Sequence, residues 1–142
     1  MKRDEALQSL SRDHHQALVI ARLLRREADR SATLEGFLRF WRQHGAIHFR
    51  IEEEVLLPAW AEAGPVDEAL VTSMLLDHLW IRTRARRLAG GEPDPPQLEE
   101  LGERLAAHVR LEEREVFPAI ERALDTPALA TAVAEAEAAA VA

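Results

Sequence analysis

Apolar residues recur along this chain at spacings of three and four residues, and no stretch alternates between apolar and polar positions. The first pattern is that of one face of an α-helix, whereas alternation would predict a strand. Breaks rich in glycine, proline and aspartate separate four such segments, at about 4–30, 33–63, 66–89 and 95–124. The pattern therefore predicts an all-α fold, an up-down-up-down four-helix bundle over residues 1–124.

The last segment, residues 125–142, consists mostly of alanine and has few large apolar side chains. Alanine has the strongest helix propensity, so this segment is predicted to form a short C-terminal helix. Because the segment offers little apolar surface, we expect this helical tail to bury little against the bundle.

An eleven-residue phrase occurs twice in the chain. HFRIEEEVLLP at 48–58 and HVRLEEREVFP at 108–118 are identical at five of eleven positions: a histidine, an arginine, two glutamates and a proline. The polar positions match as well as the apolar ones, so the hydrophobic pattern alone does not account for the repeat.

Each predicted bundle helix carries a histidine in its apolar stripe. The midpoints between successive histidines fall at residues 31, 63 and 93, inside the breaks between helices. In antiparallel helices joined by short loops, residues equidistant from the turn lie at one height. The bundle should therefore bring four histidines into one layer: His14, His48, His78 and His108. His15 stays an alternative to His14, should the register of the first helix differ by one residue.

Two glutamates extend this layer. Glu52 and Glu112 each follow a layer histidine by four residues, so they share its helix face and lie on one side of the layer. Glu53 and Glu113 are rotated by about 100° and are expected to reach solvent or an arginine. A single buried histidine is most often a hydrogen-bonded core residue, but two buried carboxylates among four imidazoles would be very costly. Two divalent cations would remove this cost, with both carboxylates able to bridge them.

The chain resembles the haemerythrin-like HHE cation-binding domain over about residues 4–124. The order of residues that carries this resemblance is His14, His48-x-x-x-Glu52, His78 and His108-x-x-x-Glu112, with an EE-x-x-x-x-P sequence at each glutamate. The resemblance implies a non-haem di-iron centre with two histidines per iron, two bridging glutamates and an oxo or hydroxo bridge. Imidazole and carboxylate ligands suit iron, while zinc and manganese stay alternatives.

The chain departs from the respiratory members of that family at two positions. Those proteins carry a further histidine where this chain has Met74, and their last carboxylate follows its histidine by five residues rather than four. The chain is more similar to a branch with four histidines and two glutamates. That branch includes proteins linked to repair of iron centres under nitric-oxide or oxidative stress, and iron or oxygen sensors.

Three hypotheses for the function follow. In the first, which we favour, the centre has an open position and binds, or also reduces, a small ligand such as dioxygen, nitric oxide or peroxide. In the second, the chain is an iron- or oxygen-sensing or iron-handling module that acts through a partner protein. In the third, zinc or another redox-silent metal is structural. The spacing does not specify an electron donor or an oligomeric state.

The open position should lie on the side of the histidine layer away from both glutamates. His44 is in the stripe of His48, one turn earlier, and is expected there as a core histidine, a further metal ligand or a proton donor to the bound ligand. The other candidates for this pocket are Leu18, Ile81, Leu105 and Met74.

Composition narrows the chemistry and the setting. The chain has no cysteine and no tyrosine, which excludes disulfides, thiolate metal sites, Fe–S clusters and tyrosyl radicals. A net charge of −7 argues against general binding of nucleic acid. No apolar run reaches the length of a membrane span and the first residues contain no apolar signal segment, so we expect no membrane anchor and a cytoplasmic location.

Overall fold

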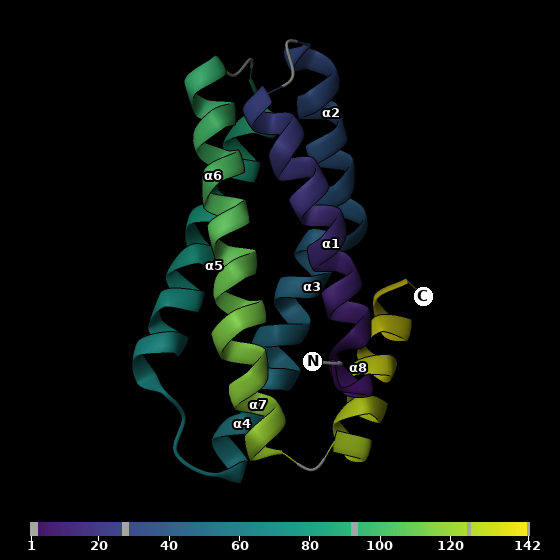
Figure 1. Cartoon of the computed structure of the whole chain (residues 1–142). Helices are drawn as coiled ribbons and strands as arrows, with labels where there is room; N and C mark the ends of the chain where they lie inside the picture. Colours follow the sequence, from purple (N-terminus) through teal and green to yellow (C-terminus); the bar gives the residue numbers. More distant parts are fainter. Residues whose placement is uncertain (1–2, 27–28, 92–93, 125, 142) are drawn as a thin grey trace.

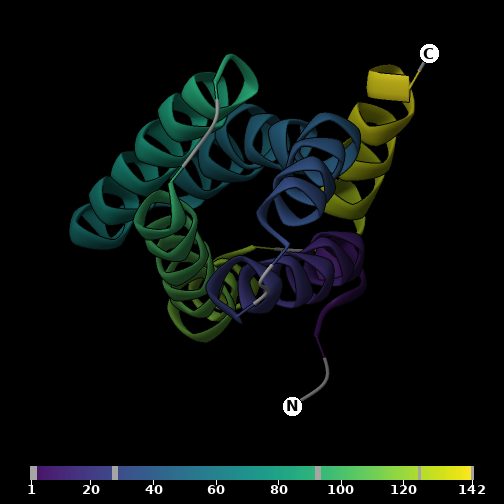
Figure 2. The ribbon, with the colours of Figure 1, turned by 90° about the horizontal axis from the view of Figure 1, so that it is seen from above.

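A computed structural model describes residues 3–26, 29–91, 94–124 and 126–141, which are almost entirely helical and include no strand. Four long helices run alternately up and down (Figure 1), and Figure 2 shows them surrounding a common axis. The first is α1, Glu5–Arg26, and the third is α5, Glu68–Ala89. The prediction of an all-α, up-down-up-down bundle is confirmed.

The second and fourth long helices each contain several elements in unbroken succession. The second consists of α2 (Arg30–Phe40), η1 (Trp41–Gly45), α3 (Ala46–Ile51), η2 (Glu52–Leu56) and α4 (Leu57–Ala63). The fourth consists of α6 (Pro95–Leu111), η3 (Glu112–Val116) and α7 (Phe117–Ala123). The elements named η are single π-turns, in which a backbone N–H donates to the carbonyl five residues earlier instead of four.

Two of the π-turns are explained by the repeated proline. Pro58 and Pro118 lack an N–H, and a proline ring inside a regular α-helix clashes with the carbonyl four residues before it. The wider turns just before them, η2 and η3, let each helix continue past its proline. Both π-turns begin at the predicted ligand carboxylates, Glu52 and Glu112.

Aspartate side chains cap the N-termini of α2, α5 and α6 by accepting backbone N–H groups three residues further on. Because Asp29 caps α2, the second helix begins at Arg30 rather than near residue 33. The first helix ends at Arg26 rather than near residue 30. These shifts leave the antiparallel pairing of the helices unchanged.

The C-terminal helix α8, Thr126–Val141, lies beside the lower half of α1 and of the second helix (Figure 1). Leu129 and Val133, one turn apart, are only 6% and 2% exposed and belong to the core of the bundle. The expectation that this tail buries little is therefore wrong, because Leu129 and Val133 share the face that meets the bundle. No described helix is both long and apolar enough to cross a membrane.

The core consists of two clusters of buried apolar side chains. The upper cluster includes Phe37 and Leu101, and the lower cluster includes Leu10, Leu56 and Ile120. The predicted layer of histidines and glutamates lies between them, so apolar residues close it from above and below.

Candidate metal centre

The six residues predicted as metal ligands lie together and are almost inaccessible to solvent: His14, His48, Glu52, His78, His108 and Glu112. Each histidine is at most 4% exposed, and both glutamates are 0% exposed. His15 is exposed, so the register of α1 turns His14 and not its neighbour toward the bundle axis.

Each glutamate divides its two oxygens between two pairs of histidines. Glu52 Oε2 lies 3.0 Å from His48 Nε2, and its Oε1 lies 3.1 Å from His78 Nε2. The same division holds for Glu112, whose Oε1 is 2.7 Å from Nε2 of the α1 histidine and whose Oε2 is 3.0 Å from His108 Nε2.

These contacts form two groups, each with ligand atoms within 4.8 Å of one another. One group takes its histidines from α1 and α3, the other takes them from α5 and α6, and both contain Glu52 and Glu112. Each group could hold a metal ion, and the two shared carboxylates stand where they could bridge a pair of ions.

A second carboxylate contacts the outward-facing Nδ1 of every ligand histidine. Each long helix supplies this carboxylate to the next helix around the bundle: Asp13 to His48 at 3.1 Å, Glu53 to His78 at 2.5 Å, Asp77 to His108 at 3.0 Å and Glu113 to His14 at 2.6 Å. An ionised carboxylate only accepts, so each Nδ1 carries the donated proton. Nε2 of every ring is thereby directed at the centre, as in carboxylate–histidine–metal triads.

The outer carboxylate of His78 is itself held in place. Glu53 accepts from the Arg82 guanidinium at 2.7 Å, and that guanidinium lies 5.7 Å from the centre of the Phe49 ring. Phe49 in turn stacks on His78, with ring centroids 3.8 Å apart and an angle of 6° between the planes. The imidazole is therefore fixed by a hydrogen bond at its edge and by a ring on its face.

The other half of the centre repeats this arrangement. Glu113 pairs with Arg3 at 3.2 Å, and Arg3 lies 5.7 Å from the centre of the Phe117 ring. His14 stacks on Phe117 at 5.1 Å. Glu53 and Glu113 thus reach an arginine, as expected, and each also contacts a ligand histidine, which was not expected.

The two halves carry different residues four positions before a ligand histidine. In α6 this position is Arg104, whose Nη2 lies 3.5 Å from Asp77 Oδ1. In the second helix it is His44, whose Nδ1 lies 3.7 Å from Asp13 Oδ1. A guanidinium always carries its charge, whereas an imidazole carries one only when protonated, so the surroundings of the two metal positions are electrostatically unequal.

A small cavity adjoins the centre on the side away from the glutamates. Its volume is about 20 Å³, enough for about one water-sized molecule. Phe40, Trp41 and Leu105 are among its apolar walls, and three ligand histidines also line it: His14, His48 and His108.

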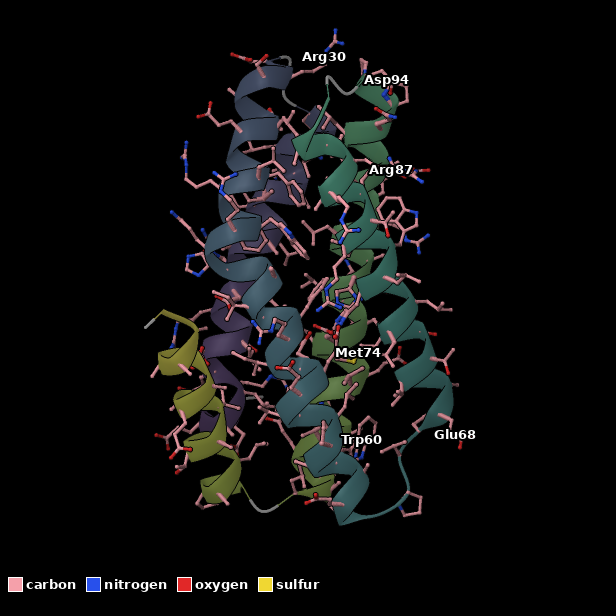
Figure 3. All side chains as sticks on the ribbon, turned by 180° about the vertical axis from the view of Figure 1, so that it is seen from behind. Arg30, Trp60, Glu68, Met74, Arg87 and Asp94 are labelled. Atoms are coloured by element: carbon pink, nitrogen blue, oxygen red, sulfur yellow. The ribbon has the colours of Figure 1, made fainter. Side chains whose placement is uncertain are left out.

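The five residues expected around this pocket lie in different places. Leu105 lines the cavity, while Ile81 is buried in the upper core and Leu18 is 37% exposed on α1. Met74 is buried in the lower core, on the glutamate side of the layer (Figure 3). The His44 side chain is 43% exposed and is absent from both groups of ligand atoms, and Arg104, at the matching position of α6, is 42% exposed.

The electrostatics of the centre favour positive charge. Burial by itself lowers the pKa of a histidine, yet the contacts with Glu112 and Glu52 raise the pKa of His78 to about 9 and that of His108 to about 10. Burial would raise the pKa of Glu112, but the adjacent His108 holds it well below its ordinary value. Two carboxylates in this layer therefore attract protons onto the histidines, or cations in their place.

The donor set fits two cations. Glu52 Oε1 and His108 Nε2 are buried and face the centre, and although each lies close to a charged partner, at 3.1 Å from His78 and 3.0 Å from Glu112, neither makes a well-formed hydrogen bond. Buried polar atoms are rarely left without a hydrogen bond, so these two atoms are suited to bind a group other than protein. Four imidazole nitrogens with carboxylate oxygens suit iron, zinc or manganese.

Asp13 and Asp77 are the functional residues that the sequence pattern did not single out. Each directly precedes a ligand histidine but contacts a different one, on the next helix. A signal was present, because Asp-His occurs once in each half of the chain, at 13–14 and 77–78. Only the antiparallel arrangement shows which imidazole each aspartate meets.

Comparison with known proteins supports this interpretation of the site. The profile of the Hemerythrin HHE cation binding domain matches residues 5–120. No curated protein and no solved structure matches the chain. The matched segment contains all six predicted ligands and all four outer carboxylates.

Proposed function

Because the chain belongs to the hemerythrin HHE cation-binding domain family, we propose that it holds two iron ions and binds a small ligand such as dioxygen, nitric oxide or peroxide beside them. One observation carries this proposal: Glu52 and Glu112 each offer one oxygen to each pair of histidines. A site for a single ion would not require both carboxylates to be shared. Bound iron would supply redox chemistry and an open coordination position.

Some residues of the chain would hold the metal ions, and others surround the space for the small ligand. The outer carboxylates fix each imidazole with Nε2 inward, so the ligands are already arranged before a metal binds. Phe40, Trp41 and Leu105 enclose an apolar space next to three of the histidines. A space for about one water-sized molecule suits a small ligand such as dioxygen or nitric oxide better than a larger substrate.

Metal analysis and visible absorption of aerobically purified protein test the proposal. We expect about two iron ions per chain and a coloured ferric centre whose spectrum changes on reduction and again on addition of nitric oxide. His48→Ala and Glu52→Ala should each remove at least one ion, while His15→Ala, at an exposed position, should remove none. Colourless protein that contains zinc and does not respond to reductant would contradict the proposal and support a structural metal.

We also propose a cytoplasmic location. We propose a small-molecule ligand rather than nucleic acid, because a net charge of −7 disfavours binding to nucleic acid. An iron- or oxygen-sensing role through a partner protein stays a second hypothesis. Reversible ligand binding without turnover of peroxide would be common to both a carrier and a sensor. Catalytic loss of peroxide would instead favour a reducing enzyme.

A further inference from the structure

A groove outside the centre combines exposed apolar residues with arginines. It lies between α5 and α6, has a volume of about 350 Å³ and is lined by Leu76, Leu79, Trp80, Thr83, Arg84, Arg87 and Arg104. Leu76 and Leu79 are 58% and 62% exposed and lie about one helical turn apart, so they form a contiguous exposed apolar pair beside Trp80. Figure 3 shows Arg87 in the upper half of α5.

Two guanidinium groups of this groove contact Trp80. The Arg84 guanidinium lies 4.6 Å from the centre of its ring system, and the Arg104 guanidinium lies 4.7 Å from it. Tryptophan and arginine are the residues most enriched where a protein interface contributes most to binding. A tryptophan between two guanidinium groups is therefore a suitable anchor for a protein partner.

The charge of the groove selects the kind of partner. Its lining contains three arginines and no carboxylate, and carboxylates outside the lining pair with two of them: Glu100 with Arg84 at 2.7 Å and Asp77 with Arg104 at 3.5 Å. The whole chain carries a net charge of −7. An acidic protein would be repelled by most of the surface and attracted to this groove, which would fix its orientation on approach.

The same groove connects directly to the candidate metal centre. Arg104, which contacts Trp80, lies 3.5 Å from Asp77, and Asp77 accepts a hydrogen bond from His108 at 3.0 Å. His108 is one of the predicted ligands. A partner seated on Trp80 would thus be separated from a metal position by only three side chains in contact.

We propose that the Leu76–Leu79–Trp80 groove with its three arginines is the docking surface for an acidic one-electron carrier protein that reduces the metal centre. This inference rests on the proposed function, because it assumes a redox-active metal. With iron held by the six ligands, the groove would place the reduced carrier near the centre, and one electron lost by the carrier would be gained by one ferric ion in each encounter.

Binding is tested with metal-loaded full-length protein and a purified acidic [2Fe–2S] ferredoxin as the probe, by titration calorimetry and by stopped-flow reduction. We expect binding that weakens as ionic strength rises. The variant Thr83→Glu/Arg87→Glu should weaken binding and slow reduction by about tenfold, since charge-paired contacts at interfaces commonly contribute at least that much. Leu79→Glu, at a highly exposed position, should do the same without unfolding the protein.

The matched control is Arg39→Glu/Gln43→Glu. It changes the charge by the same amount, at the same spacing of four residues, on exposed positions of the second helix outside the groove. It should bind ferredoxin within about twofold of the unaltered protein, as surface charges away from an interface do. Equal loss in the control and groove variants would overturn the proposal, because binding would then follow net charge alone.

Two further results separate the possible failures. Sedimentation that shows a dimer abolished by Leu79→Glu would mean that a second copy of this chain occupies the groove, and it would overturn the carrier proposal. If dithionite reduces the centre while ferredoxin neither binds nor reduces it, the groove proposal fails and the proposed function stands. If no redox-active metal is present, the proposed function fails, and calorimetry with oxidised ferredoxin still reports on the groove.

Discussion

At the scale of single residues, every ligand histidine depends on a carboxylate from a neighbouring helix. Asp77 holds His108 and Asp13 holds His48, and both aspartates are about one-fifth exposed, at 23% and 21%. An outer carboxylate fixes the tautomer of the imidazole and increases its basicity as a ligand. The affinity of the centre for metal should therefore depend on residues that never touch the metal.

The variant Asp77→Asn tests this dependence. The amide keeps the size of the side chain but loses the negative charge that orients His108, so affinity for metal should fall by about 10- to 100-fold. Competition with a chelator of known affinity measures the change. The control is Glu115→Gln, at an exposed position of η3, which should leave affinity unchanged. If both variants bind metal equally well, the outer carboxylates have no such role.

The pH dependence of the metal-free protein follows from the same residues. Although burial lowers the pKa of a histidine, contacts with Glu112 and Glu52 raise the pKa of His78 from 6.5 to about 9 and that of His108 to about 10, so their contribution to stability is complete below pH 6.5 and is lost as pH rises through those values. The pKa of Glu112 is lowered, so its contribution persists above its ordinary value of 4.5 and disappears only in acid.

Urea unfolding of the metal-free protein should therefore show a maximum at about pH 5–6.5 and a steady decline toward pH 10. Metal binding should show the opposite trend, because cations displace the protons from the histidines more easily as pH rises. A midpoint that stays constant between pH 6 and pH 10 would mean that these histidines are neutral in the metal-free fold.

At the scale of elements, π-turns adjust the two helices that supply the repeated phrase. Pro58 and Pro118 require the turns η2 and η3. The third π-turn, η1, contains Gly45, where an added Cβ would lie 2.7 Å from Cε3 of Trp41. The close approach of Trp41 to this glycine forms one wall of the cavity beside the centre.

Two glycines in the second helix should respond in opposite ways to alanine. Gly36→Ala meets nothing within 4 Å and should raise the free energy of unfolding by about 0.5–1 kcal/mol, because alanine is the better helix former. Gly45→Ala collides with Trp41 and should lower it by about 1–3 kcal/mol. Urea unfolding of both metal-free variants measures the difference, and a stabilising Gly45→Ala would mean that Trp41 moves freely.

At the scale of the whole molecule, the polar layer lies between an upper and a lower apolar core. The same side chains that would hold metal also fill the middle of the bundle. Without cations, the layer brings two carboxylates and four imidazoles together in the interior. Binding of metal to the folded state alone adds its free energy to that of folding.

Removal of metal should therefore lower the melting temperature of the intact chain. Free metal at 100 to 1,000 times its dissociation constant adds about 3–4 kcal/mol, which corresponds to roughly 10 °C for a domain of this size. Calorimetric melting with metal and after chelation measures the shift, and restored metal should restore the original value. Equal melting temperatures would indicate that the fold does not depend on the occupancy of this layer.

Much of the fold and the candidate ligand set could be predicted from spacing. His48 and Glu52 share a helix face because four residues make about one turn, and Glu112 repeats the relation with His108. The common height of the histidines followed from their equal distances to the breaks. These are local or symmetric relations, which an α-helix of constant pitch carries over several turns.

The position of His44 was decided by the tertiary structure, because the rotation of the second helix against its neighbours leaves this side chain 43% exposed beside Asp13 of α1. The role of the tail was decided in the same way, since Leu129 and Val133 of α8 need the surface of the bundle to bury them. The pairing of Asp13 with His48 also depends on a neighbouring helix. The sequence by itself determined which residues share a face, whereas contacts between faces of different helices required the packed bundle, because only packing sets the rotation of each helix against the next.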